Sequence, residues 1–407
     1  MVKSKKFPGQ PIFSQVLQLI PREILSGLVK QYGSDRYVKK FKTFDQLVAM
    51  LFCALERCTS TREVQTGLQV WEGRLVHLGV HSYPCRSTLS DANRRCPEAL
   101  FGDLYHALVK LYYPQLFPDS RAALSQSERL FIIDSSTIEL FQDVMRGAGM
   151  GKMDGRRKGG VKAHTMINAA HNIPCLVYLS EAKENDRVVM DKIDVPKGSI
   201  LVFDKGYVKY RQWQKWTEAK IYWVTRLNDE AYYQVLEDRP VNEKQANAGV
   251  SEDQLILLGS GTTPGSEVIM ARRVKYYDAD KERWFVFVTN HTQFSASHIA
   301  DLYRKRWQIE TLFKSVKQNF QFRYFLGESA NAICIQIWCA LIADLLLKVI
   351  QRSVKKKTWA LSNLSAMIRM HLATYVDIFA FLNNPEKALR RALALNPLQG
   401  KLIFDSC

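Results

Sequence analysis

The sequence of 407 residues is poor in cysteine, short of acidic side chains and without an uninterrupted apolar segment of membrane-spanning length. Its eight cysteines are scattered singly, with no C-x-x-C pair and no tight Cys/His cluster. This excludes a disulfide-stapled miniprotein and gives no support to a zinc site, and it indicates reduced thiols in a cytoplasmic protein. No apolar stretch of signal-peptide length follows the basic N-terminus, so we do not expect secretion.

The most apolar window covers residues 332–350, and polar side chains interrupt it at Gln336, Asp344 and Lys348. A membrane span needs about 20 consecutive, mainly apolar residues. The interruptions therefore predict a buried core helix, and we expect no membrane partner.

Motifs for nucleotide chemistry are absent as well. The Gly-rich segment 147–152 resembles a phosphate-binding P-loop, but Arg146 stands in place of its first glycine and Met153 in place of its Ser or Thr. The sequence also contains no G-x-S-x-G elbow and no H-E-x-x-H pair.

Positive charge, by contrast, is abundant: 57 lysines and arginines face 40 aspartates and glutamates, a formal net charge of +17. The cations gather in three runs, at 146–162, 304–306 and 355–357. Any one run is equally compatible with an ordinary solvated surface. Three runs in one strongly basic chain favour a nucleic-acid partner, because clustered cations bind a phosphate backbone.

The periodicity of apolar residues changes along the chain and predicts five parts. Residues 1–125 are expected to form a helical N-terminal domain, 126–228 the first part of an α/β core and 229–295 a β-rich insertion. Residues 296–352 would complete the core, and 353–407 would form a helical C-terminal region. The fold class expected is therefore α/β, with a mixed sheet interrupted by the insertion.

Short apolar runs give the expected strands. In the core these are 130–133, 161–167, 174–179, 200–203 and 221–225, and in the insertion 232–236, 254–258, 268–277 and 284–289.

Two carboxylates stand out by position. Asp134 follows the apolar run 130–133, and Asp204 follows 201–203. A carboxylate at the end of a buried strand is costly unless a cation or hydrogen-bond donor receives it. Either residue alone is also typical of a strand-end aspartate that caps a turn. Two such residues in the core of a basic protein favour a functional site.

A third acid lies in the expected helix 295–320. At about 100° per residue, Tyr303, Arg306, Glu310 and Lys317 fall on one narrow stripe beside an apolar stripe. Glu310 is therefore expected at the rim of the buried face, flanked by cations. An ordinary salt-bridged helix surface would give the same pattern.

Tyr303-x-x-Arg306-x-x-x-Glu310, followed by Lys317, resembles the Y-R-E-K signature of bacterial insertion-sequence transposases of the DDE class. Further segments that resemble this family are 131–137 (FIIDSST), 162–165 (KAHT), 204–207 (DKGY) and 224–226 (VTR). The β-rich insertion before the glutamate is a further similarity. The resemblance covers about residues 128 to 350.

The resemblance implies a ribonuclease-H-like fold on which Asp134, Asp204 and Glu310 form the catalytic triad. These acids would hold two Mg²⁺ ions, for which Mn²⁺ would substitute, because carboxylate oxygens are the ligands that Mg²⁺ prefers. Two such ions activate the attacking oxygen and stabilise the leaving oxygen of a phosphodiester.

The resemblance also implies double-stranded DNA as the partner, at the terminal inverted repeats and at the target. Residues expected to contact DNA are Tyr303, Arg306, Lys317, Arg226, Lys162, Arg156, Arg157 and Lys158. A homodimer pairing two DNA ends and a location on the bacterial nucleoid in the cytoplasm are implied in the same way.

Several residues remain open between function and structure. Family members often cut through a hairpin while an aromatic side chain stacks near an extruded base. Trp284 and Trp223 are candidates for that aromatic, although their apolar strands favour core packing. Asp186 lies near the metals by resemblance but also suits a helix N-cap, and His164 suits either an approach to the site or a backbone bond within its strand.

Residues 87–95 carry several basic side chains and suit a recognition helix. The preceding helix ends too far upstream for the short turn of a helix-turn-helix. Both interpretations therefore stay open.

The expected function is an active DNA transposase that cuts the ends of an insertion sequence and joins the 3′-OH ends to target DNA. A structure-selective nuclease of the same superfamily is the first alternative. A DNA-binding regulator that has lost catalysis is the second, although all three acids are present.

Overall fold

The structure, a computed structural model, describes residues 9–71, 75–80, 82–116, 129–139, 160–170, 173–259, 267–320, 322, 324–354 and 359–395. The chain divides into two compact units, each formed by discontinuous segments. One unit comprises residues 1–118, 140–159 and 315–407, and the other comprises 119–139 and 160–314.

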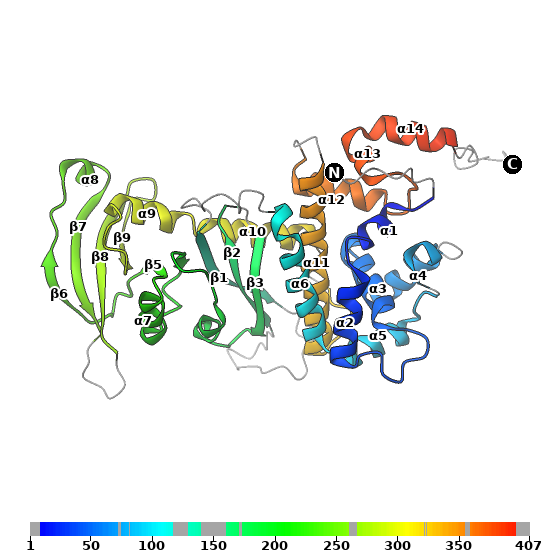
Figure 1. Ribbon diagram of the computed structural model, residues 1–407, viewed down its shortest axis with the longest axis horizontal. Helices are drawn as coiled ribbons and strands as arrows, with labels where there is room; N and C mark the ends of the chain where they lie inside the picture. Colours follow the sequence, from blue (N-terminus) through cyan, green and yellow to red (C-terminus); the bar gives the residue numbers. More distant parts are fainter. Residues whose placement is uncertain are drawn as a thin grey trace. The chain divides into compact units, whose positions relative to one another are not determined.

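A nine-stranded mixed sheet forms the frame of the second unit (Figure 1). Its strands are β1 (Leu130–Glu139), β2 (Gly160–Asn168), β3 (Ile173–Glu181), β4 (Ile200–Phe203), β5 (Tyr222–Arg226), β6 (Tyr233–Asp238), β7 (Val250–Leu258), β8 (Ile269–Asp278) and β9 (Arg283–Thr289). Their order across the sheet is β3-β2-β1-β4-β5-β9-β8-β7-β6. The expected mixed α/β architecture is confirmed.

Only the centre of the sheet is parallel. β1, β4 and β5 run in the same direction, and all other neighbours are antiparallel. The parallel strand β4 is buried along its whole length, as expected for a strand covered on both faces. The β-rich segment continues this sheet, because β9 pairs with β5.

Short helices accompany the sheet. They are the 3₁₀ helix η3 (Asp186–Lys192) and the α-helices α7 (Tyr210–Glu218), α8 (Glu243–Asn247) and α9 (Ala296–Arg304). A buried aromatic cluster holds α7 against the sheet: Trp213 lies 4.6 Å from Trp223 of β5, ring centre to ring centre. Apolar burial thus fixes the strands that carry Asp204 and Arg226.

Two expectations about local structure are wrong. β1 does not end before Asp134 but continues to Glu139, because β2 pairs with it along its whole length. The expected helix 295–320 is two helices, α9 and α10 (Trp307–Asn319). Between them the amides of Arg306, Gln308 and Ile309 bond to the third residue before them, which is the tighter 3₁₀ pattern.

The other unit is helical in its described parts. Its helices are α1 (Ile12–Leu17), α2 (Arg22–Tyr32), α3 (Thr43–Glu56), α4 (Thr61–Gln69), η1 (Leu75–Leu78), α5 (Arg86–Arg95), α6 (Glu98–Leu116), α11 (Ala330–Ser353), α12 (Leu361–Met370), α13 (Ile378–Asn383) and α14 (Pro385–Leu395). α11 is long and apolar enough to cross a membrane, but 89% of its most apolar window is buried. The expected core helix is confirmed.

Candidate active site

Asp134, within β1, and Asp204, directly after β4, lie at the same level of two adjacent parallel strands. Ile133 of β1 pairs with Phe203 of β4, and the aspartate is the next residue along the chain in each case. Neighbouring strands lie about 4.8 Å apart, so the two backbones hold these carboxylates side by side. Beyond this point β4 ends, whereas β1 continues beside β2.

Glu310 reaches the same place from α10. Arg306 donates through Nη1 to Oδ2 of Asp134 and through Nη2 to Oε1 of Glu310, each at 2.6 Å. Since both nitrogens belong to one planar guanidinium, the two bonded oxygens lie within about 8 Å of each other. The 3₁₀ turn between α9 and α10 carries the arginine that makes this bridge.

A second cation and a phenol hold Asp204. Arg226 at the end of β5 donates to its Oδ1 through Nη2 at 2.7 Å and through Nε at 3.2 Å. Tyr303 of α9 donates its hydroxyl to the same oxygen at 3.0 Å. Residues on β1, β5, α9 and α10, or directly after β4, therefore meet around three carboxylates, with Arg306 bonded to two of them and Arg226 to the third.

The two aspartates differ in acidity. Burial raises the pKa of Asp134 to about 6, against the opposing effects of Arg306 and of the Ser135 amide, and the charges of Asp204 and Glu310 add to the increase. Burial would also raise the pKa of Asp204. The hydrogen bonds and charge of Arg226, the Lys205 amide and Tyr303 outweigh it, so the pKa of Asp204 is lowered.

A fourth carboxylate, Asp186, lies beside Ser135, the residue after Asp134. Asp186 accepts a hydrogen bond from Ser135 at 3.0 Å and lies 3.3 Å from Nζ of Lys162. The buried ring of His164 bonds to Ser180 and has its Nδ1 3.5 Å from Asp186. The N-cap of η3 is Asn185 and not Asp186, so the interpretation of Asp186 as a cap is wrong.

The donor set has the chemistry of a divalent-metal site without its converged geometry. Among the described residues, no group of three or more His, Cys, Asp or Glu side chains is arranged to hold an ion. Arg306, however, is a cation already seated between Asp134 and Glu310. The acids therefore fit a cation, and hard carboxylate oxygens suit Mg²⁺ or Mn²⁺.

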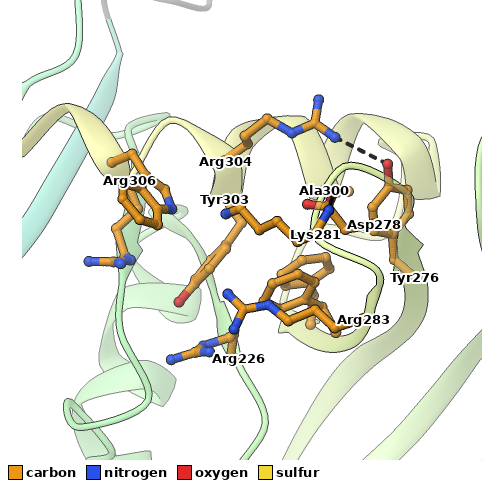
Figure 2. Close-up of a pocket in the computed structure, with 12 residues that line it drawn as sticks. Arg226, Tyr276, Asp278, Lys281, Arg283, Ala300, Tyr303, Arg304 and Arg306 are labelled. Carbon is orange, nitrogen blue, oxygen red and sulfur yellow. Dashed lines mark hydrogen bonds between the residues drawn. The ribbon is translucent and has the colours of Figure 1, made fainter.

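Beside the acids lies a pocket of about 240 Å³ (Figure 2). Its cationic walls are Arg226, Lys281, Arg283, Arg304 and Arg306. Its aromatic walls are Tyr276, Phe285, Phe287, Tyr303 and Trp307. The hydroxyl of Tyr276 accepts a hydrogen bond from Arg304 at 3.1 Å, as the dashed line in Figure 2 shows. This mixture of charge and flat rings suits a phosphate with an attached base.

The pocket contains residues that the sequence did not single out. Trp307 is half exposed and lies under Lys281, whose Nζ is 4.6 Å from the ring centre. Its position directly after Arg306, inside the signature, was the available signal. Lys281 lies in the turn between β8 and β9, Arg283 is the first residue of β9, and neither carried a signal of its own in the sequence.

The two tryptophans proposed for base stacking differ. Trp223 is fully buried in the core, as expected. Trp284 is 53% exposed, so the expectation of core packing is wrong for it. It stands on β9 beside Tyr277 and Lys275. Neither tryptophan lines the pocket.

Not every predicted DNA contact falls at this site. Lys162 contacts Asp186 and donates to the carbonyl of Glu184, and it contacts none of the three acids directly. Lys317 is exposed on α10, in the part of that helix that belongs to the other unit. Arg156, Arg157 and Lys158 lie outside the described residues.

One family model and the curated relatives show the family of this chain. A model described as "Transposase DDE domain" matches residues 125–346, and one described as a domain of unknown function matches residues 8–81. The y4zB protein of Sinorhizobium fredii (strain NBRC 101917 / NGR234), named as a transposase, is 32% identical over 271 residues, which cover 66% of this chain and 72% of that protein.

A transposase for insertion sequence element IS5377 of Geobacillus stearothermophilus is named among the relatives too. It is 25% identical over 273 residues, covering 67% of this chain and 69% of its own. Among solved structures, a synaptic complex of piggyBac transposase with hairpin DNA matches with a TM-score of 0.46 at 11% identity, over 94% of this chain and 84% of that one. The matched family model and the first relative show that this chain belongs to the insertion-sequence DDE transposases and is a DNA transposase.

Proposed function

We propose that this transposase cuts both ends of an insertion sequence and joins the freed 3′-OH ends to target DNA, with Asp134, Asp204 and Glu310 as its catalytic acids. The observation that carries the proposal is the bridge from Asp134 through Arg306 to Glu310, beside Asp204. Acids 176 residues apart in sequence, at 134 and 310, share one guanidinium. The strand order β3-β2-β1-β4-β5 supports a ribonuclease-H-like core.

Divalent metal use is general in this family, and we propose Mg²⁺, with Mn²⁺ as a substitute. Asp134, Asp204 and Glu310 are the residues that would hold two ions. When bound, such ions activate the attacking oxygen and stabilise the leaving oxygen of a phosphodiester. The strands β1 and β4 and the helix α10 give the three acids rigid supports.

The remaining side chains have distinct tasks in this proposal. Arg226 and Tyr303 keep Asp204 ionised and oriented through Oδ1. The cationic pocket receives a phosphate and an unstacked base of the transposon end, because arginine forks bind phosphate and aromatic faces bind a base. Trp307 is the aromatic we assign to this stacking, in place of Trp223 and Trp284.

Water and then a DNA 3′-OH are the nucleophiles, so no covalent bond forms between protein and DNA. The DNA partners proposed are the terminal inverted repeats and the target duplex, bound by a homodimer on the nucleoid. We assign further DNA contacts to Lys162 and Lys317, and to Arg156, Arg157 and Lys158 outside the described residues.

Substitution of one acid tests the assignment. Asp134→Asn keeps the shape of the side chain but removes a charge that two metals need, so cleavage of a flank-bearing element end should fall at least about 10³-fold while end binding persists. Asp191→Asn is the matched control, since Asp191 is exposed on η3 and pairs only with Lys209 among the described residues.

Cleavage and strand transfer are read on gels, with gel shift for binding. Full strand transfer by Asp134→Asn would contradict the assignment. A wild-type protein that cuts but never joins a 3′-OH to a new site would instead contradict the joining step.

A further inference from the structure

Arg306 joins two acids that come from different elements. Its Nη1 donates to Oδ2 of Asp134 and its Nη2 to Oε1 of Glu310, each at 2.6 Å. The side chains of Arg306 and Asp134 are 12% and 17% exposed and so largely shielded from water, whereas that of Glu310 is 40% exposed. The guanidinium therefore occupies one oxygen of each acid, in the space between them where a divalent ion shared by Asp134 and Glu310 would bind.

The second arginine of the site engages its acid in another way. Arg226 donates from two nitrogens to Oδ1 of Asp204, and Tyr303 donates to the same oxygen. No described side chain donates to Oδ2 of Asp204. A divalent ion can thus approach Asp204 without displacing Arg226, whereas an ion bound between Oδ2 of Asp134 and Oε1 of Glu310 requires Arg306 to leave.

The bridge also leaves Arg306 incompletely satisfied. Its Nε is buried and has no hydrogen-bond partner among the described residues. A buried N–H without an acceptor is unfavourable, and a phosphate offers a guanidinium two parallel acceptors. Arg306 lines the cationic pocket together with Lys281 and Arg304, so a phosphate bound there lies beside it.

We propose that Arg306 is an exchangeable internal cation that couples DNA binding to metal loading. A phosphate of the bound DNA end draws Arg306 away from Asp134 and Glu310, and the pair then presents its oxygens to a divalent ion. The inference rests on the proposed function, because it takes these acids as metal ligands. Linkage is reciprocal, so the metal ion must strengthen DNA binding by the same factor.

Manganese binding to the full-length protein without DNA is the first test, with free Mn²⁺ followed by electron paramagnetic resonance. Arg306→Gln and Arg226→Gln each remove one positive charge beside the acids, but only the first uncovers the bridged oxygens. We expect Arg306→Gln to bind Mn²⁺ about tenfold more tightly than Arg226→Gln, within the usual range for coupled sites. Equal affinities of the two variants would overturn the proposal.

Arg306→Lys separates charge from bridging, and it serves if the glutamine variant does not fold. Lysine keeps the positive charge but has no planar fork to span both carboxylates. It should therefore bind Mn²⁺ more tightly than the wild-type protein does. An affinity no higher than that of the wild type would count against the exchange.

The DNA arm uses a blunt duplex of the element's own end, taken from the DNA beside its gene and carrying no flank to cut. After subtraction of Mn²⁺ bound by the duplex alone, the duplex should tighten Mn²⁺ binding to the wild type about tenfold and leave Arg306→Gln nearly unchanged. An equal gain in both proteins would overturn the coupling.

Failure of the metal site itself is recognised separately. Glu310→Gln added to Arg306→Gln should abolish the gain in Mn²⁺ affinity. If the double variant keeps it, the ion is bound elsewhere, and the assignment of the acids is at fault together with the exchange that depends on it.

Discussion

Asp134 is the carboxylate of the site in which burial and function conflict. Its side chain is less exposed than those of Asp204 and Glu310, and burial raises its pKa to about 6 even with Arg306 at 2.6 Å. The ionised form that a metal ion requires is therefore the form that the surroundings disfavour. Asp204 has the opposite balance, because its donors lower its pKa.

This difference predicts the acid limb of the pH profile. Because the pKa of Asp134 is raised, lowering the pH below about 6 protonates it first, and the cleavage rate should fall about tenfold for each pH unit below that value. Asp204 should stay ionised in this range, so one proton accounts for the slope. The measurement is single-turnover cleavage from pH 5 to 8 at a fixed Mn²⁺ concentration well below saturation, because a bound metal ion itself favours the ionised carboxylate. A rate that stays constant down to pH 5 would refute the raised pKa of Asp134.

Trp284 and Trp223 show how far the burial of a single residue can be predicted from the sequence around it. Both stand in apolar strands, and the pattern around them favours burial for both. Trp223 pairs with Leu201 in the centre of the sheet and meets Trp213, so it is buried. Trp284 lies near the start of β9 and pairs only with Tyr277 of β8, so half of it faces solvent. Whether each tryptophan is buried depends on the other elements that cover it, and no local sequence pattern specifies that coverage.

At the scale of elements, the helical segment that carries the signature is interrupted between Tyr303 and Glu310, next to the acids. The sequence 295–320 has one continuous apolar stripe, which is why it predicted a single helix. The 3₁₀ turn at Lys305–Arg306 instead separates α9 from α10. Tyr303 before the turn donates a hydrogen bond to Asp204, and Arg306 within the turn donates one to Asp134.

A buried ion pair fixes the start of α9. Arg272 of β8 binds both carboxylate oxygens of Asp253 on β7, at 2.8 and 2.6 Å. Its Nη1 donates to the carbonyls of Phe294 at 2.5 Å and Thr292 at 3.2 Å, just before the N-cap Ser295. The β-rich segment thus anchors the helix that carries Tyr303.

Removing this arginine should destabilise the protein strongly. Arg272→Met leaves the carboxylate of Asp253 buried without its partner, which costs about 3–5 kcal/mol. Arg211→Met is the control, because Arg211 is exposed on α7 and should change stability by about 0.5 kcal/mol or less. Urea unfolding followed by tryptophan fluorescence measures both. If the Arg272 and Arg211 variants unfold at the same urea concentration, the buried pair contributes little.

Helices and strands could be predicted where a local sequence pattern specifies them. The strands that pair with one another and the side chains that contact one another could not. The positions of β2, β4, β7 and β9 follow from their apolar runs within a few residues. The full length of β1 depends on pairing with β2, and the continuation of the sheet depends on Arg226 pairing with Phe287. Likewise, Asp134, Asp204 and Glu310 were identified by their positions and by resemblance, but the bridge through Arg306 joins residues too distant in sequence for any periodicity to indicate.

At the scale of the whole molecule, the net charge of +17 is unevenly distributed. Residues 146–159 of the run 146–162 and the whole run 355–357 lie outside the described residues. In the part that the structure describes, the pocket beside the acids collects five cationic side chains against one aspartate, Asp278. The pocket is therefore a local concentration of positive charge, beyond what the positive net charge of the whole protein would give.

The salt dependence of DNA binding distinguishes the contribution of the pocket from that of the overall positive charge. Each cation that neutralises a phosphate releases counterions, so the slope of log K against log salt falls by about 1 for each phosphate that is no longer neutralised. Lys281→Gln should therefore reduce the slope for an element-end duplex by about 1. Lys215→Gln removes the same charge from an exposed position on α7 that does not line the pocket, and it should leave the slope nearly unchanged.

Fluorescence anisotropy between 50 and 200 mM salt, a range in which such slopes are measurable, gives both values. Equal slopes for Lys281→Gln and Lys215→Gln would mean that the protein attracts DNA through its overall charge and that the pocket holds no phosphate. A reduced slope confined to Lys281→Gln would place a phosphate beside Arg306, where the exchange between guanidinium and metal ion requires it.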